Sequence, residues 1–384
     1  MAVSRHIPES RTLMITNQPL PATMKAVVLE APRRLVLRNI PVWPIEAYGD
    51  RDMVMVKVAA CGVCGSDYRY FAGENPWSMH TLGRHVANPP GIVLGHEFAG
   101  EVVAVVDEKN AGLLGKRVAP VCSKVCGTCP ECLSGRTQLC PNTIHMGHGQ
   151  GWGKRDFYPG AYAEYVPAWG NGCFAIPDGL TFGEAAMMDI LAVCVHVAHQ
   201  GNVQPGRPVL MMGAGPAGNG IAQAARNLGA GRIVVTDIAD APLEAARRRG
   251  FDAVVDARGK SPGGLAEELA ALAPGGFGSV FDSVGGRANF ELGLGLLGKM
   301  GTLVNMAIHD LDIPVNFLRL GSERRITTSS NFATGDYPWA LSWLESGRFV
   351  VKDWLTEIGI EDVPGVFAEA AGAGRRAFKL VIGF

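Results

Sequence analysis

The feature that most constrains the fold is a glycine-rich turn, GAGPAG, at residues 213–218. It follows an apolar segment, PVLMM (208–212), and precedes a stretch with helical periodicity. A second apolar segment then ends at Asp237. A strand, a glycine turn, a helix and a second strand in this order predict a parallel sheet of the doubly wound type. A glycine turn without a ligand is the alternative.

The same turn predicts a dinucleotide site. Its first glycine permits the tight turn, its second lets the backbone approach a pyrophosphate, and its third lets helix and strand pack closely. Asp237 is expected to accept hydrogen bonds from ribose hydroxyls, and no cation follows it at 238–240, which favours NAD over NADP. The expected contacts in the turn are Gly213, Gly215, Pro216, Ala217 and Gly218.

The chain divides by pattern into two kinds of structure. Up to about residue 187, short β-branched segments such as 53–60 and 98–106 alternate with Gly or Pro and predict a barrel-like β domain. From residue 190, strands alternate with helices, and FKLVIGF (378–384) is a final strand predicted to rejoin the first domain. We expect an N-terminal extension (1–23), a catalytic domain (24–189 and 333–384) and a cofactor domain (190–332). Further strands are expected at 279–285, 301–307 and 324–329.

Composition argues against several functions. The net charge is -1 without a basic face, so we expect no nucleic acid partner. The sequence contains no apolar stretch of about 18 residues, so we expect no membrane span. The first 23 residues lack the apolar centre of a signal peptide, and nine cysteines without a disulfide pattern predict reduced thiols and a cytoplasmic protein.

Four cysteines crowd into one segment, at Cys126, Cys129, Cys132 and Cys140. Four thiolates at this spacing can close a tetrahedral zinc site, which is structural because no coordination position stays open. We therefore expect a zinc-ordered lobe over residues 122–140. A disulfide pair or free thiols are the alternatives, and Cys122 is a spare thiol nearby.

Further motifs complete a pattern: CGVCGSD (61–67), GHEFAG (95–100), GAYAEYV (160–166) and Asp189 in AAMMDILAV. With the four cysteines and the glycine turn, they resemble the medium-chain, zinc-dependent alcohol dehydrogenase family, including its polyol and threonine dehydrogenase branches. The resemblance extends from Met24 to Phe384. It implies a GroES-like β domain beside a Rossmann-type domain, and a homo-oligomer that is a dimer or a tetramer.

The resemblance also implies a catalytic zinc. Cys64 and His96 are its expected ligands, with Asp189 as the third and Glu97 as a carboxylate that approaches the metal in some states. Asp67 is expected to orient His96.

Other roles follow from the same resemblance. Ser66 is expected to take the alcohol proton, and Ser283, Val284 and Met306 are expected beside the nicotinamide. Cys61 is expected to be a packing residue, although it forms C-x-x-C with Cys64, a spacing also found in redox motifs.

The implied reaction transfers a hydride between an alcohol substrate, a secondary alcohol or a polyol, and NAD. A zinc-free quinone or double-bond reductase of the same superfamily is one alternative, and a non-catalytic NAD- and zinc-binding protein is another. One departure from the family concerns Arg69, which stands where many relatives have a relay histidine and which cannot take up a proton. Candidate replacements are His80, His85, His145 and His148, which are more simply explained as exposed or structural.

Two long segments, 76–90 and 144–160, are candidate walls of the substrate pocket. Their aromatic residues Trp152, Phe157 and Tyr158 are expected either to line that pocket or to pack beneath a loop.

Overall fold

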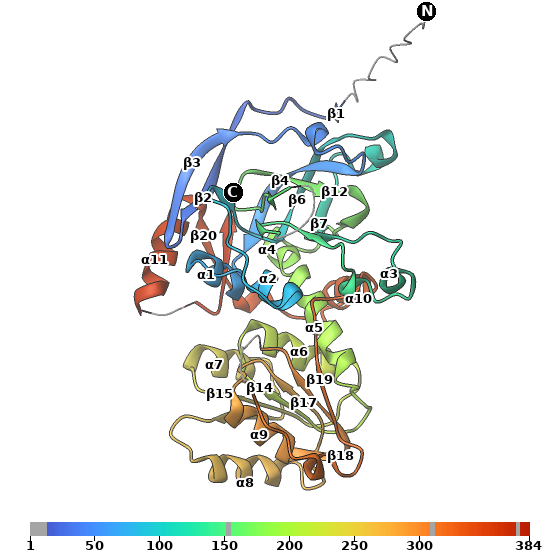
Figure 1. Cartoon of the computed structure of the whole chain (residues 1–384), viewed down its shortest axis with the longest axis vertical. Helices are drawn as coiled ribbons and strands as arrows, with labels where there is room; N and C mark the ends of the chain where they lie inside the picture. Colours follow the sequence, from blue (N-terminus) through green and yellow to red (C-terminus); the bar gives the residue numbers. More distant parts are fainter. Residues whose placement is uncertain (1–13, 151–154, 308–311, 374–376) are drawn as a thin grey trace, which may run out of the picture.

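The computed structural model describes residues 14–150, 155–307, 312–373 and 377–384. Figure 1 shows two groups of elements: a β-rich group containing the N-terminal half and the C-terminal strand, and a group built around the sheet of the middle of the chain. Within the described residues, no helix has both the length and the apolar character needed to cross a bilayer.

Six parallel strands form the sheet of the second group, in the spatial order β16-β15-β14-β17-β18-β19. This order reverses direction at β14, as in a doubly wound sheet. The strands are β14 (Val209–Met212), β15 (Ile233–Asp237), β16 (Ala253–Asp256), β17 (Phe277–Asp282), β18 (Leu297–Asn305) and β19 (Arg325–Thr328). The predicted doubly wound sheet is confirmed, with strand ends shifted by a few residues.

Both faces of this sheet are buried, which explains why its strands are apolar at consecutive positions. Val209 and Met211 pack on one face against helices α5 and α6. Leu210 and Met212 pack on the other face against helices α8 and α9. The helices of the second group are α5 (Met188–Gln200), α6 (Pro216–Asn227), α7 (Asp240–Arg248), α8 (Pro262–Leu272) and α9 (Arg287–Leu296).

The β-rich group centres on a mixed sheet in the order β13-β7-β6-β4-β21-β20, with β1 on β6 and β12 on β4. The C-terminal strand β21 pairs antiparallel with β4, so the predicted return to the first domain is confirmed. The strands are β1 (Ile15–Thr16), β4 (Met53–Gly62), β6 (Glu97–Val105), β7 (Arg117–Pro120), β12 (Tyr165–Trp169), β13 (Cys173–Ala175), β20 (Leu355–Gly359) and β21 (Lys379–Gly383).

Smaller elements complete this group. The remaining strands are β2 (Thr23–Ala31), β3 (Arg34–Pro41), β5 (Ile92–Val93), β8 (Ser123–Lys124), β9 (Ile144–His145), β10 (His148–Gly149) and β11 (Phe157–Tyr158). The remaining helices are α1 (Gly65–Phe71), α2 (Pro76–Leu82), α3 (Pro130–Leu133), α4 (Phe182–Ala186), α10 (Asp336–Glu345) and α11 (Val363–Ala373).

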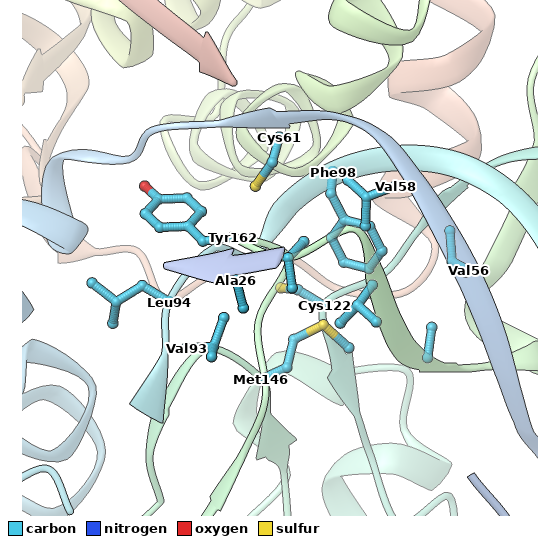
Figure 2. Packing of buried hydrophobic residues seen from close by; sticks show 14 of the residues in the cluster. Ala26, Val56, Val58, Cys61, Val93, Leu94, Phe98, Cys122, Met146 and Tyr162 are labelled. Atoms are coloured by element: carbon cyan, nitrogen blue, oxygen red, sulfur yellow. The ribbon is translucent and has the colours of Figure 1, made fainter. Parts of the chain in front are cut away.

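The core of the β-rich group lies between its sheets, where Figure 2 shows apolar side chains from separate strands facing one another. Cys61 is fully buried in this core, and burial raises the pKa of its thiol well above the ordinary value. A buried, protonated thiol is a poor redox centre. This placement supports the prediction that Cys61 is a packing residue.

The described part of the N-terminal extension, residues 14–23, is paired with the β-rich group. Ile15 and Thr16 pair antiparallel with Val105 and Ala104 at the end of β6. The Thr16 hydroxyl also donates to the backbone carbonyl of Val103. Backbone groups of β6 that would otherwise lack a partner therefore anchor the extension at this point.

Candidate active site

Strand register brings the first set of metal donors together. Gly62, the last residue of β4, lies opposite Glu97, the first residue of β6. Cys64 follows as the N-cap of α1, and His96 directly precedes β6. The donor atoms of Cys64, His96 and Glu97 consequently lie within 4.8 Å of one another. A side chain at Gly62 would collide with the Glu97 carboxylate, so this close approach needs the glycine.

Asp67 contacts two of these donor residues, Cys64 and His96. Its Oδ2 accepts hydrogen bonds from the Cys64 N–H and the Tyr162 hydroxyl, each at 2.8 Å. Its Oδ1 lies 3.6 Å from His96 Nδ1, and neither atom has a hydrogen-bond partner. Burial lowers the pKa of His96, but the negative charges of Asp67 and Cys64 outweigh burial and hold it well above the ordinary value. Asp67 therefore lies beside the imidazole of His96 that it was expected to orient. The distance of 3.6 Å between Asp67 Oδ1 and His96 Nδ1 is too long for a hydrogen bond.

Asp189 lies close by, on the first turn of α5, but outside the group of three donors. Its Oδ1 accepts a hydrogen bond from the Cys122 thiol at 3.0 Å. Burial raises the pKa of Asp189 to about 6, and the charge of His96 opposes that rise. The structure thus places Glu97 nearer to Cys64 and His96 than it places Asp189, which was the predicted third ligand.

Two contacting residues, Cys122 and Lys379, were assigned no role by the sequence reasoning. Cys122, taken only as a spare thiol, is buried between Asp189 and His145, whose Nε2 lies 3.1 Å from the sulfur. His145 in turn contacts His148 at 2.9 Å, and burial lowers the pKa of both imidazoles, to about 3 for His148. The two histidines are thus buried and neutral, which agrees with the interpretation of both as structural residues rather than as a proton relay.

Lys379 is the second residue that sequence reasoning missed. Its buried ammonium forms an ion pair with Glu97 and donates to the Val63 carbonyl at 3.0 Å. A lysine at the start of a C-terminal strand carries no local sign of this role. Only the pairing of β21 with β4 brings it here.

Ser66 and Arg69 both lie on α1. Ser66 is half-buried in the first turn, two residues after Cys64. Arg69 forms an ion pair with Glu74 at 2.7 Å, on the partly exposed side of the helix.

The four cysteines of the lobe form the second set of donors, again within 4.8 Å of one another. Their sulfur atoms lie 4.0 Å apart for Cys126 and Cys132, and 3.5 Å apart for Cys126 and Cys140. A tetrahedron with Zn–S bonds of about 2.3 Å has edges of roughly 3.8 Å. The four thiols therefore fit zinc, and all nine cysteines of the chain are free of disulfides.

The glycine turn between β14 and α6 has the geometry that a dinucleotide needs. Gly213 has a φ of 95°, which disfavours a side chain. A Cβ at Gly218 would collide with the Gly213 carbonyl oxygen, whereas a Cβ at Gly215 would meet nothing within 4 Å. The turn is therefore closed on the sheet side and open at Gly215, where a pyrophosphate could approach the helix that Pro216 and Ala217 begin.

Asp237 ends β15 beside this turn. Its carboxylate accepts hydrogen bonds from the N–H groups of Ala214 at 2.6 Å, Ile238 at 2.7 Å and Ala239 at 2.9 Å. The backbone thus fixes a carboxylate at the strand end where a ribose would lie.

The residues predicted on the nicotinamide side follow β17 and β18. The Ser283 hydroxyl donates to the Met212 carbonyl, and Val284 next to it is 53% exposed. The Met306 N–H donates to the Asp282 carbonyl. All three lie at the carboxyl ends of parallel strands, at the same edge as Asp237.

The aromatic residues of the two long segments, 76–90 and 144–160, lie in different environments. Tyr158 and Trp77 line a cavity of about 980 Å³. Phe157 packs against the core, and Trp152 lies outside the described residues. Part of the segment 76–90 and Tyr158 thus line a cavity, and their role as walls of a substrate pocket stays a prediction.

Comparisons with known proteins agree with this architecture. The family model for the alcohol dehydrogenase GroES-like domain matches residues 50–178, and that for the zinc-binding dehydrogenase matches residues 216–346. The chain is 30% identical over 341 residues to sorbitol dehydrogenase of Bacillus subtilis, covering 88% of this chain and 90% of that protein. It is 29% identical over 345 residues to D-xylulose reductase A of Aspergillus oryzae, covering 88% and 92%.

A solved structure is also similar. An oxidoreductase/dehydrogenase of unknown specificity from Escherichia coli, involved in membrane biogenesis, superposes with a TM-score of 0.82 at 26% identity. The match covers 94% of this chain and 99% of that one.

A doubly wound sheet with a dinucleotide turn, joined to a β domain with two sets of metal donors, defines an oxidoreductase of the two-domain, metal-containing class. The chain belongs to the zinc-dependent medium-chain alcohol dehydrogenase family.

Proposed function

We propose that the protein transfers a hydride between a secondary alcohol or polyol and NAD. The observation that carries this proposal is the assembly of Cys64, His96 and Glu97 donors in a chain that also has the open glycine turn. The similarity to a sorbitol dehydrogenase and a D-xylulose reductase supports the polyol class. The intact donor set argues against a zinc-free reductase.

Cys64 and His96 would hold the catalytic zinc together with a carboxylate, either Glu97 or Asp189. A zinc ion with an open position supplies Lewis acidity toward a substrate oxygen. Each carboxylate has a competing partner, because Glu97 is paired with Lys379 and Asp189 with Cys122. Cys126, Cys129, Cys132 and Cys140 would hold the structural zinc.

Ser66 would take the alcohol proton, since it lies two residues from Cys64 on the same helix. Arg69 cannot replace the relay histidine, because its guanidinium keeps its proton and is paired with Glu74. Water or the cofactor ribose would then receive the proton from Ser66.

NAD would bind along the edge formed by the glycine turn, Asp237, Ser283, Val284 and Met306. A 2′-phosphate would meet the Asp237 carboxylate, which the backbone N–H groups hold in place. NAD is therefore the proposed cofactor rather than NADP.

We further propose a homo-oligomer formed through the edge of the six-stranded sheet. On its open side, β19 has only β18 as a neighbour within the described residues. The preceding turn exposes Phe317 and Leu318 by 82% and 87%. An unpaired edge next to large exposed apolar side chains is suited to pairing with a second copy.

Two smaller proposals concern organisation. The domain boundaries would fall at 189/190, within the first turn of α5, and at 332/333, between β19 and α10. The free cysteines favour a reducing compartment, the cytoplasm.

The test combines zinc content with NADH formation across primary, secondary and cyclic alcohols, polyols and threonine. We expect two zinc ions per chain, turnover with NAD and little with NADP. Cys64→Ser should retain one zinc and lose NADH formation. Cys132→Ser should also lose one zinc, while Cys173→Ser, outside both donor sets, should keep two. Full zinc in Cys64→Ser would contradict the ligand assignment, and two zincs without turnover on any alcohol would contradict catalysis.

A further inference from the structure

Two strands at the base of the cysteine lobe bring Cys122 and His145 together. Strand β8 leads into the lobe and β9 follows it, and their antiparallel pairing sets Ser123 opposite His145. The Met146 N–H donates to the Cys122 carbonyl at 3.1 Å, directly beyond this pair. The buried Cys122 sulfur lies 3.1 Å from His145 Nε2 and 3.0 Å from Asp189 Oδ1. The base of the lobe therefore presents a thiol to one of the two carboxylates that could bind the catalytic zinc.

Hydrogen bonds of two histidines fix which ring nitrogen of His145 carries a proton. His145 Nδ1 lies 2.9 Å from the Met146 carbonyl oxygen, which can only accept a hydrogen bond. The proton of this neutral ring is therefore on Nδ1, and Nε2 is an acceptor. His148 agrees, because its Nδ1 donates to the Gly149 carbonyl and its Nε2 accepts from His145 Nδ1, each at 2.9 Å. The Cys122 sulfur thus faces a nitrogen that accepts hydrogen bonds.

The thiol of Cys122 has one proton and two acceptors within reach. Burial raises the pKa of this thiol well above its ordinary value, so the sulfur keeps its proton. An ionised carboxylate is a stronger acceptor than a neutral imidazole, so the S–H donates to Asp189 at 3.0 Å. If Asp189 turns away, His145 Nε2 accepts this hydrogen bond instead, and no buried donor is left unpaired. The hydrogen bond to Asp189 is therefore favoured but reversible.

The need for an open coordination position gives this hydrogen bond its importance. Cys64, His96 and Glu97 already place three donor atoms within 4.8 Å of one another. The charge of Asp189 also acts on His96, so this carboxylate lies near the same donors. A catalytic zinc has three protein ligands and one open position, whereas four protein ligands make a closed, structural site. Asp189 as a fourth ligand would close the position that a substrate oxygen needs.

We propose that Cys122 is a positioning residue that keeps Asp189 off the catalytic zinc through the hydrogen bond from its thiol. Glu97 then completes the protein ligands, and the fourth position stays open for the substrate. This inference rests on the proposed function, since it concerns the zinc of that site. Cys122 acts through Asp189 rather than as a ligand.

The experiment uses the full-length enzyme with cobalt(II) in the catalytic site and zinc in the cysteine lobe. Visible absorption follows the binding of imidazole at the open position, and competition with a chelator follows the loss of cobalt. Cys122→Ala should weaken imidazole binding and slow cobalt loss, each about tenfold, the scale on which partners of metal ligands alter a site. A purely structural role of Cys122 would speed cobalt loss instead, because a cavity beside the site would loosen its packing.

Further variants separate the effect of the carboxylate from that of the cavity. Cys122→Ser keeps a donor and should behave as the wild type. Asp189→Asn removes the competing carboxylate and should retain cobalt with an unchanged spectrum. The double variant Cys122→Ala/Asp189→Asn should return both measurements to wild-type values. The matched control is Cys173→Ala, because the Cys173 thiol donates to the Trp169 carbonyl and lies outside both donor sets.

The outcomes separate this inference from the proposed function. Unchanged imidazole binding in Cys122→Ala, or a double variant as defective as Cys122→Ala, would overturn the inference. Loss of cobalt from Asp189→Asn would also overturn it, because Asp189 would then already be a ligand. Any of these results in an enzyme that forms NADH from an alcohol would leave the dehydrogenase function standing. The expected cobalt results without NADH formation from any alcohol would support the role of Cys122 and contradict the function.

Discussion

Single residues in this chain are constrained by what their side chains would touch. The three glycines of the cofactor turn share one motif but not one environment. Gly218 faces the Gly213 carbonyl, whereas Gly215 faces open space. The close contact at Gly218 is needed for folding, and the open space at Gly215 is available to a ligand. The motif alone could not separate these two roles, because they depend on the path of the neighbouring backbone.

This difference predicts opposite phenotypes for two alanine variants. Gly218→Ala should lower the free energy of unfolding by about 3 kcal/mol, because overpacking forces the backbone apart. Gly215→Ala should cost less than about 1 kcal/mol but weaken NADH binding, because its methyl group occupies the approach of the pyrophosphate. Urea unfolding and NADH fluorescence titration measure the two effects. Equal loss of stability in both variants would contradict the assignment.

Among the elements, the pairing of β4 with β6 creates the candidate active site. The packing of α10 against α5 joins the β-rich group to the second group, and Asp336 at the start of α10 contributes to it. Its carboxylate contacts His196 Nδ1 at 2.8 Å and His199 Nδ1 at 3.3 Å, both on α5. Burial would raise the pKa of Asp336, but these hydrogen bonds lower it to about 2 from an ordinary 3.8.

This shift predicts a pH-dependent contribution to stability. A carboxylate with a depressed pKa stabilises the folded state above its unfolded pKa and loses that effect as the pH falls through its folded pKa. Asp336→Asn should therefore lower the free energy of unfolding by about 2 kcal/mol at pH 7. The gap should shrink as the pH falls from about 4 toward 2.

Urea unfolding of the wild type and Asp336→Asn at pH 7, 5, 4 and 3 measures this gap. Asp178→Asn is the control, because its side chain is fully exposed. A gap at pH 3 as large as that at pH 7 would show that Asp336 acts through packing rather than through its charge.

For the whole molecule, the open edge of the six-stranded sheet is the feature that predicts assembly. Phe317→Asp combined with Leu318→Asp should shift the sedimentation coefficient from that of an oligomer to that of a monomer, because burying two carboxylates in an apolar interface is unfavourable. Leu133→Asp, at another exposed apolar residue of the cysteine lobe, should leave the coefficient unchanged. An oligomer of unchanged mass in the double variant would place the interface elsewhere.

Features of this chain that depend on local order could be predicted from the sequence. The glycine turn between two strands specified the doubly wound sheet, and the spacing of four cysteines specified a set of donors that the structure brings together. Such patterns are readable because neighbours in sequence are neighbours in space. Which distant groups meet depends on the tertiary structure: Cys122 with Asp189, and Lys379 with Glu97. Those contacts depend on strand register and domain packing, for which the chain carries no local signal.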